Sequence, residues 1–149
     1  MLKIAGSYQL GAPIDQAWPH IFEPRSLMGL IPGCQQLEQI SPDEYRGQIQ
    51  VGLAAVSGTY ASYVRVIERD PPHRCRFEGK VTGATGSIGG MASFHLKEVN
   101  HNHSLIEYQA EAMITGALAK LSPRLVEGVA QTLINLGLAN LNRQLQAGR

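Results

Sequence analysis

The most constraining feature of this sequence is a change in the spacing of its apolar residues near Gly116. Between residues 35 and 114, apolar and polar residues alternate in short runs, and turn-forming sequences such as Asp70-Pro71-Pro72 separate these runs. Alternation with a period of two is typical of half-buried β-strands. After Gly116 the apolar residues recur every three to four positions, as they do along one side of an α-helix. The pattern therefore predicts an antiparallel sheet followed by a long C-terminal helix.

The segment before residue 35 completes the expected domain. Residues 2–10 alternate as well and predict a first strand. Two short helices are expected next, one opening at Ala12 and one that follows Pro24 and ends at Pro32-Gly33. Six further strands then form a meander over residues 35–114. Residues 1–149 thus predict one α+β domain of the helix-grip type, in which a curved antiparallel sheet of about seven strands wraps around the C-terminal helix.

The terminal helix carries two apolar stripes, so we expect it to contact more than one surface. The first stripe consists of Leu118, Leu121, Leu125, Val129, Leu133 and Leu136. The second consists of Ile134, Leu138, Leu141 and Leu145. Serine caps helix N-termini and proline fits the first turn, so at Ser122-Pro123 the helix either kinks or begins.

Charge and composition exclude several classes of protein. The chain has 149 residues, a length typical of one domain. Its 13 Lys and Arg residues nearly balance 12 Asp and Glu residues and are scattered, which argues against a nucleic-acid partner. The N-terminus lacks the pattern of a secretory signal, and no apolar run is long enough to span a bilayer. We therefore expect a cytoplasmic protein with at most peripheral contact to the inner face of the membrane.

Small residues are concentrated on the apolar face of the expected sheet. They are Gly79, Gly90, Ala92, Ala110 and Ala112. Their size favours a cavity between sheet and helix, and the alternative is that they let the helix pack closely. The residues expected to contact a ligand in this cavity are Tyr60, Val64, Phe77, Val81, Ile88, Met91, Phe94, Tyr108, Ala112, Leu118, Leu121, Leu125 and Val129. Leu30, Ile31 and Pro32 are expected to form an apolar gate, with glycine-rich residues 82–91 as a second movable segment.

The sequence offers little for catalysis or metal binding. Its five histidines fall in turns, in helices or on the polar strand face, and no third ligand accompanies His101 and His103. Cys34 and Cys75 have no histidine in register, so two unreactive thiols are expected. We expect no catalytic residue, no metal site and no tightly required cofactor.

Several short motifs, taken in order, resemble the carbon monoxide dehydrogenase G-subunit family of the START-like, polyketide-cyclase-like superfamily. They are Leu30-Ile31-Pro32-Gly33-Cys34, Asp43-Glu44-Tyr45 with Gly47, Val51-Gly52, residues 56–58, Asp70-Pro71-Pro72, Phe77-Glu78-Gly79 and residues 125–130. The resemblance covers nearly the whole chain. It implies a sheet-helix cavity for a hydrophobic small molecule.

In members that accompany molybdenum-containing carbon monoxide dehydrogenase, the resemblance implies an accessory role near the membrane and its lipid-soluble quinones. Those members extend further at the C-terminus than Arg149, so we expect less membrane anchoring here. The leading hypothesis is a non-enzymatic protein that holds a quinone or lipid and serves a molybdenum hydroxylase-type enzyme. The alternatives are a small cyclase- or hydrolase-type enzyme and a scaffold that docks partners through Leu138, Leu141 and Leu145. A homodimer stays open.

Overall fold

The computed structural model describes residues 2–52 and 56–147. Leu53 and Ala55, which the sequence places at a strand end and in the next turn, lie outside these residues. Seven antiparallel strands form one sheet in the order β1-β7-β6-β5-β4-β3-β2. The strands are β1 (Leu2–Leu10), β2 (Cys34–Ser41), β3 (Glu44–Val51), β4 (Gly58–Asp70), β5 (Arg74–Gly83), β6 (Gly86–Asn100) and β7 (His103–Thr115). The predicted strand number and meander are confirmed.

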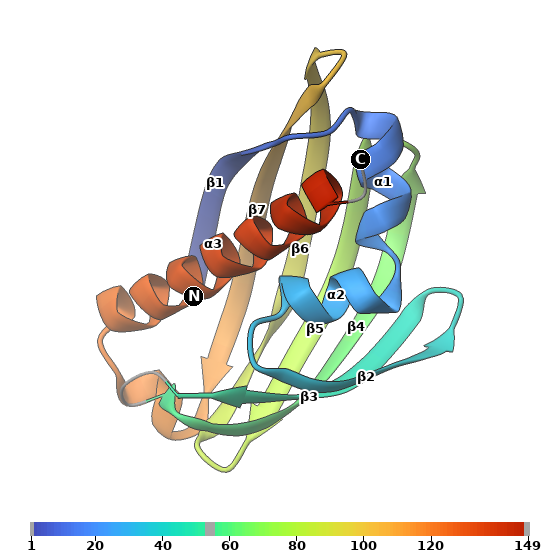
Figure 1. Ribbon diagram of the computed structural model, residues 1–149. Helices are drawn as coiled ribbons and strands as arrows, with labels where there is room; N and C mark the ends of the chain where they lie inside the picture. The colour runs from blue at the N-terminus through green and yellow to red at the C-terminus, as the bar shows by residue number, and fades with distance from the viewer. Residues whose placement is uncertain (1, 53–55, 148–149) are drawn as a thin grey trace.

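The helices α1 (Ile14–Ile21), α2 (Pro24–Leu30) and α3 (Pro123–Ala147) lie on one face of the sheet (Figure 1). The 3-10 helix η2 (Gly116–Lys120) connects β7 to α3. The long helix α3 crosses the sheet, as the helix-grip prediction requires (Figure 1). It begins at Pro123 and is separated from η2 by Leu121 and Ser122, and the Val126 amide donates to the Ser122 carbonyl at 3.2 Å. Of the two possibilities at Ser122-Pro123, the structure therefore shows a helix start.

The second predicted stripe is correct, and the first is correct at Leu118, Val129 and Leu133 but wrong at Leu125 and Leu136. Leu138, Leu141 and Leu145 are at most 5% exposed, whereas Leu125 is 37% and Leu136 is 49% exposed. This stripe continues toward the N-terminus through the half-buried Ile134 and Ala130 and the buried Val126. The first predicted stripe assumes one continuous helix from Leu118 onward. In the structure η2 and α3 are separate helices, so the helical periodicity starts again at Pro123. A shift of one residue turns a helical side chain by about 100°.

The helix α2 approaches α3 closely at a pair of glycines. A Cβ atom on Gly137 would lie 2.1 Å from the Leu30 carbonyl oxygen, so only glycine fits there. The Asn140 side-chain amide donates to the Gly29 carbonyl at 2.9 Å, which satisfies an unpaired carbonyl at the end of α2. These contacts hold the end of α2, and the Leu30–Pro32 segment after it, against the middle of α3.

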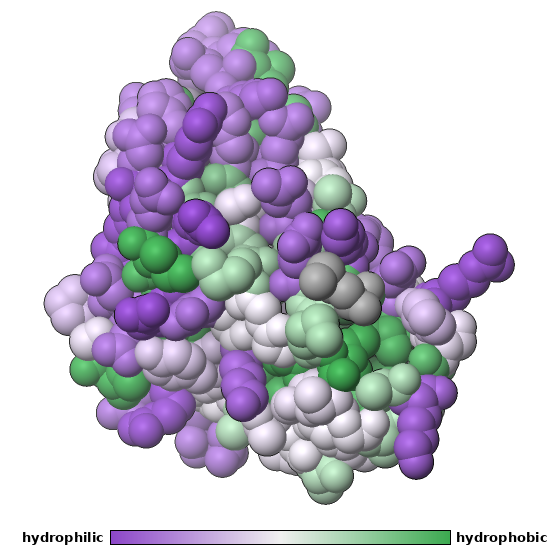
Figure 2. Space-filling view, turned by 180° about the vertical axis from the view of Figure 1, so that it is seen from behind, coloured by the Kyte–Doolittle hydropathy of each residue, from purple (hydrophilic) through white to green (hydrophobic). Residues whose placement is uncertain are grey.

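The outer face of the sheet is polar. Cross-strand ion pairs there include Arg65 with Glu78 at 2.7 Å and Lys97 with Glu107 at 2.6 Å. All four side chains are more than a third exposed, and such pairs contribute little stability. Figure 2 views the molecule from this side, and hydrophilic residues dominate the upper half of the view. The stabilising apolar contacts lie on the inner face, between sheet and helices.

Candidate functional site

Two cavities lie between the sheet and the helices. The wider one, about 300 Å³, is bounded by β2 to β7 and by α1, α2 and α3, and its sheet wall includes Val64, Phe77 and Ala92. The narrower one, about 220 Å³, lies nearer η2 and is bounded by Val81, Ile88 and Leu118. Both cavities are lined by Leu30, Ile31 and Ile134. The two cavities are therefore compartments that meet at these three side chains.

The structure brings most of the predicted ligand-contacting residues to these walls. Tyr60, Val81, Ile88, Leu118 and Val129 line the narrow compartment. Val64, Phe77, Phe94 and Tyr108 line the wide one. The predicted gate residues Leu30, Ile31 and Pro32 line the narrow compartment, and the first two also reach the wide one. Ligand contact at all of these positions stays a prediction.

Four predicted contact residues line neither compartment. Met91 faces the outer side of the sheet near Lys3 and Glu111, because it alternates with the inward-facing Ala92. Leu125 points to solvent because the helical periodicity starts again at Pro123. Its neighbour Val126 lines the narrow compartment instead.

The other two lie on the inner side of the fold but line neither cavity. Ala112 belongs to the row of Leu2 and Gly90, toward the edge strand β1. Leu121, between η2 and α3, packs beside the small core of Val56, Tyr60 and Leu118.

Sequence reasoning missed a set of wall residues. The inward-facing ones are Ile21, Phe22, Leu27, Leu37, Tyr45, Ile49, Val51, Val56, Ser62, Val66, Cys75, Ala92, Ile106, Ala110, Val126, Ala130, Leu133, Ile134, Leu138 and Leu141. The strand members share the alternating phase of the residues that were predicted, so that signal was present. No sequence pattern indicated that side chains of α1 and α2 would line the compartment, because their position depends on how these helices pack over the sheet.

Small residues create the wide compartment. Ala92 and Ala110 are register partners on β6 and β7 and both line its wall. Gly79 and Gly90 form the neighbouring pair on β5 and β6. A large side chain in place of either alanine would project into this space, so the sheet and α3 do not interdigitate fully. Of the two interpretations of these small residues, the structure supports the cavity.

The tyrosine hydroxyl groups in the walls already have partners within the protein. Tyr60 donates to the Val56 carbonyl at 2.6 Å. Tyr45 donates to the Phe22 carbonyl at 3.3 Å, and the Tyr108 hydroxyl accepts from the Gln131 side chain at 2.6 Å. Burial raises the pKa of Tyr45 above its ordinary value, which keeps this hydroxyl neutral. These tyrosines therefore serve the walls as apolar rings with satisfied polar ends.

The two thiols differ in burial. Cys75 lines the wide compartment, is 3% exposed, and burial raises its pKa to about 11. Cys34 is half-buried, its thiol lies 3.3 Å from the Gln36 carbonyl, and burial also raises its pKa. Since the thiolate is the reactive form, neither residue is activated as a nucleophile.

We expect a thiol reagent at pH 8 to modify Cys34 at least about tenfold faster than Cys75, because Cys75 is both enclosed and protonated. The measurement is the rate of colour release from a chromogenic disulfide in the native protein. A Cys34→Ser variant isolates Cys75 and serves as the control. Equal rates would mean that solvent reaches the wide compartment freely.

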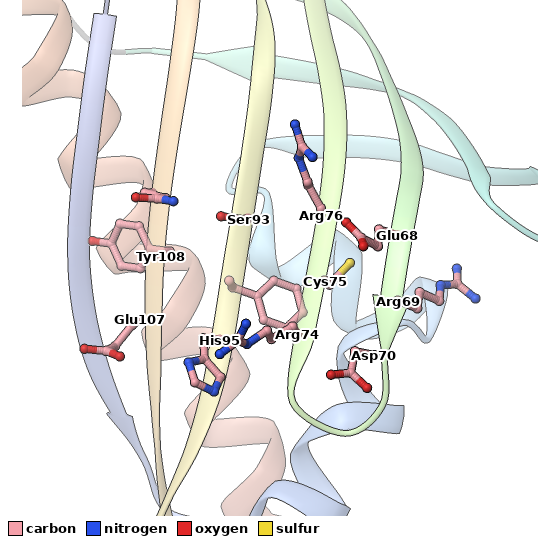
Figure 3. Close-up of a pocket in the computed structure, with 12 residues that line it drawn as sticks. Glu68, Arg69, Asp70, Arg74, Cys75, Arg76, Ser93, His95, Glu107 and Tyr108 are labelled. Carbon is pink, nitrogen blue, oxygen red and sulfur yellow. The ribbon is translucent and has the colours of Figure 1, made fainter.

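A third hollow, about 590 Å³, lies on the outer face of the sheet. Figure 3 shows its side chains coming from β4 to β7, with Arg74 and Arg76 on β5, His95 on β6 and Glu107 on β7. Its charges are mixed. A hydrogen bond from Lys97 lowers the pKa of Glu107, and desolvation with nearby Arg74 lowers the pKa of His95. This surface is a solvated strand face, so the inner compartments are the better candidate for ligand binding.

Neither metal clusters nor bilayer-spanning helices occur in the described structure. Among residues 2–52 and 56–147, no three His, Cys, Asp or Glu side chains gather as a metal site would require. Within the same residues, no helix is both long enough and apolar enough to cross a bilayer.

Solved structures of other proteins resemble this one over its full length. A conserved protein from Geobacillus kaustophilus is 27% identical, with a TM-score of 0.94 over 98% of this chain and 96% of its own. A START superfamily protein from Mycobacterium smegmatis is 6% identical, with a TM-score of 0.77 over 99% of both chains. The di-domain ARO/CYC BexL from the BE-7585A biosynthetic pathway is 14% identical, with a TM-score of 0.71 over 98% of this chain and 47% of its own. The last two likenesses establish the fold alone.

Sequence comparison identifies the family. No curated protein matches the chain. The family model of the carbon monoxide dehydrogenase G subunit (CoxG) matches residues 6–146, which include every wall residue of both compartments. The chain therefore belongs to the CoxG family, and its fold is START-like.

Proposed function

We propose that this chain is a binding protein that holds a hydrophobic small molecule, a quinone or a lipid, between its sheet and α3. We further propose that it presents this molecule to a molybdenum hydroxylase-type enzyme. The family membership and the START-like fold support the first statement. The family's description as a carbon monoxide dehydrogenase subunit, with the accessory role that the sequence resemblance implies, supports the second.

The observation that carries the proposal is the chemistry of the two compartments. In the part of the chain that the structure describes, no Asp, Glu, His, Lys or Arg side chain lines either one. Affinity for an apolar molecule comes from removing its surface from water, at about 25 cal/mol per Å² before the cost of association. General acid-base catalysis needs a group that titrates near the working pH beside the substrate, so these walls favour binding over cyclase or hydrolase chemistry.

The burial of α3 disfavours the scaffold alternative. That alternative requires Leu138, Leu141 and Leu145 to be exposed, and their exposed fractions are 5%, 0% and 1%. They pack against the sheet and α1 instead. A partner that docked on them would have to displace the core of the domain.

The proposal predicts that a hydrophobic molecule co-purifies with the protein. The test is mass spectrometry of an organic extract of gently purified protein, beside an extract from a mock purification. We expect one quinone or lipid species at close to one molecule per chain. An empty extract, together with no displacement of an added hydrophobic dye, would contradict the binding function. A stoichiometric lipid without any quinone would retain the binding function and remove the support for a redox partner.

A further inference from the structure

One buried hydroxyl group in the wide compartment has no partner within the described protein. Ser62 on β4 is 6% exposed and lines this compartment. It alternates with the outward-facing Ala61 and Tyr63 and shares the inner face with Tyr60 and Val64. Its Oγ makes no hydrogen bond with any described residue, and it is not among the fully enclosed atoms without a partner, which are the Oγ atoms of Ser26 and Ser104. The Ser62 hydroxyl therefore faces the compartment with its hydrogen-bonding capacity unused by the protein, and polar groups inside proteins normally have a partner.

The surroundings of Ser62 leave its hydroxyl accessible from the cavity. Its register partner on β3 is Gly47, which has no side chain to cover it. Its partner on β5 is Val81, which lines the narrow compartment. Ser62 therefore lies on the sheet where the walls of the two compartments adjoin. On the helix side, Leu30, Ile31 and Ile134 mark the same junction.

Other polar groups near the wide compartment are less suited to contact a ligand. The hydroxyls of Tyr45 and Tyr108 are already hydrogen-bonded. Ser93 and Gln109 are register partners at outward-facing positions and also border the hollows of the outer face. The Cys75 thiol is a weak donor. Ser62 thus combines burial, an inward direction and an unused hydrogen-bonding capacity.

We infer that Ser62 is the polar anchor of the site and selects apolar ligands that carry a hydrogen-bonding oxygen atom. The inference deepens the proposed function and rests on it. The hydroxyl donates to a carbonyl oxygen, or exchanges a hydrogen bond with a hydroxyl, of a ligand placed at the junction. The apolar remainder of the ligand then extends into the compartments on either side.

The test compares two probes of nearly the same shape, 2-acetylnaphthalene and 2-isopropenylnaphthalene, which differ by a carbonyl oxygen in place of a methylene group. Their dissociation constants are measured by displacement of a hydrophobic dye. Each dissociation constant is corrected for the partition of that probe between water and an alkane. After this correction, we expect the native protein to bind the ketone more tightly than the hydrocarbon. In Ser62→Ala we expect the ketone to bind about three- to tenfold more weakly, with the hydrocarbon little changed.

Two further variants separate anchoring from a general effect of mutation. Ser62→Thr keeps a hydroxyl and should retain the preference for the ketone. Ser104→Ala removes a hydroxyl that is also buried, at 0% exposure, and unpartnered within the described residues, but that lines neither compartment. It should leave the preference unchanged.

The possible failures are distinguishable. If both probes bind and Ser62→Ala leaves their ratio unchanged, the anchoring role is wrong and the binding function stands. If Ser104→Ala changes the ratio as much as Ser62→Ala does, the effect is not local and the anchoring role is also wrong. If neither probe displaces the dye and the extract is empty, both the anchor and the proposed function are overturned.

Discussion

Replacing Ala92 with tryptophan is expected to abolish binding of the hydrophobic ligand while the protein stays folded. Ala92 lines the wide compartment and lies between Phe77 on β5 and Ala110 on β7. An indole ring is large enough to occupy much of the space that a ligand would fill. A ligand would then have to expel a side chain that is tethered in place. We expect affinity to fall by about a hundredfold or more, which corresponds to about 2.7 kcal/mol.

The matched control for Ala92→Trp is Ala61→Trp. Ala61 lies on the exposed outer face of β4, so the same ring added there should leave ligand affinity unchanged. Affinity is measured by dye displacement, and folding by circular dichroism and thermal unfolding. Should the tryptophan overpack the core, Ala92→Phe adds a smaller ring and is expected to give a partial loss of affinity. Native affinity in a folded Ala92→Trp protein would place the ligand outside the wide compartment.

Replacing Gly137 with alanine is expected to destabilise the protein, although alanine is the better helix former by about 1 kcal/mol. The added Cβ would lie 2.1 Å from the Leu30 carbonyl oxygen and 2.8 Å from the Leu30 carbonyl carbon. Both are backbone atoms, so α2 must move away from α3. Overpacking of this kind costs about 1–3 kcal/mol, so after the gain in helix propensity we expect a net loss of unfolding free energy of up to about 2 kcal/mol. Denaturant unfolding measures it.

The same helix provides the control for Gly137→Ala. A Cβ atom added at Gly128 would meet no atom of another described element within 4 Å, so Gly128→Ala should stabilise the protein by about 0.5–1 kcal/mol through helix propensity alone. Because Leu30 borders both compartments, Gly137→Ala should also change the rate of dye release, whereas Gly128→Ala should not. Equal stability of the two variants would contradict the close packing of α2 against α3.

The sequence predicted the sheet well because β alternation is a local signal. The spacing of Tyr60, Val64, Phe77 and Phe94 places them on the inner face, and all line a compartment. The same rule should have excluded Met91, which alternates with Ala92 and faces outward. The error at Leu125 has a different origin, because it comes from carrying the helical phase of η2 across a break in the helix.

The sequence by itself therefore determined the order of elements, the inner face of each strand and the small residues that leave space over the sheet. All of these follow from the period of side-chain direction along one segment. Only the tertiary structure decided that the space is divided into two compartments, and that Leu30, Ile31 and Ile134 lie where they meet. It also decided that the Ser62 hydroxyl lacks a partner within the described residues while the Tyr60 and Tyr108 hydroxyls have one. These features depend on contacts such as Gly137 with Leu30, which join residues far apart in the chain, and no local pattern encodes them.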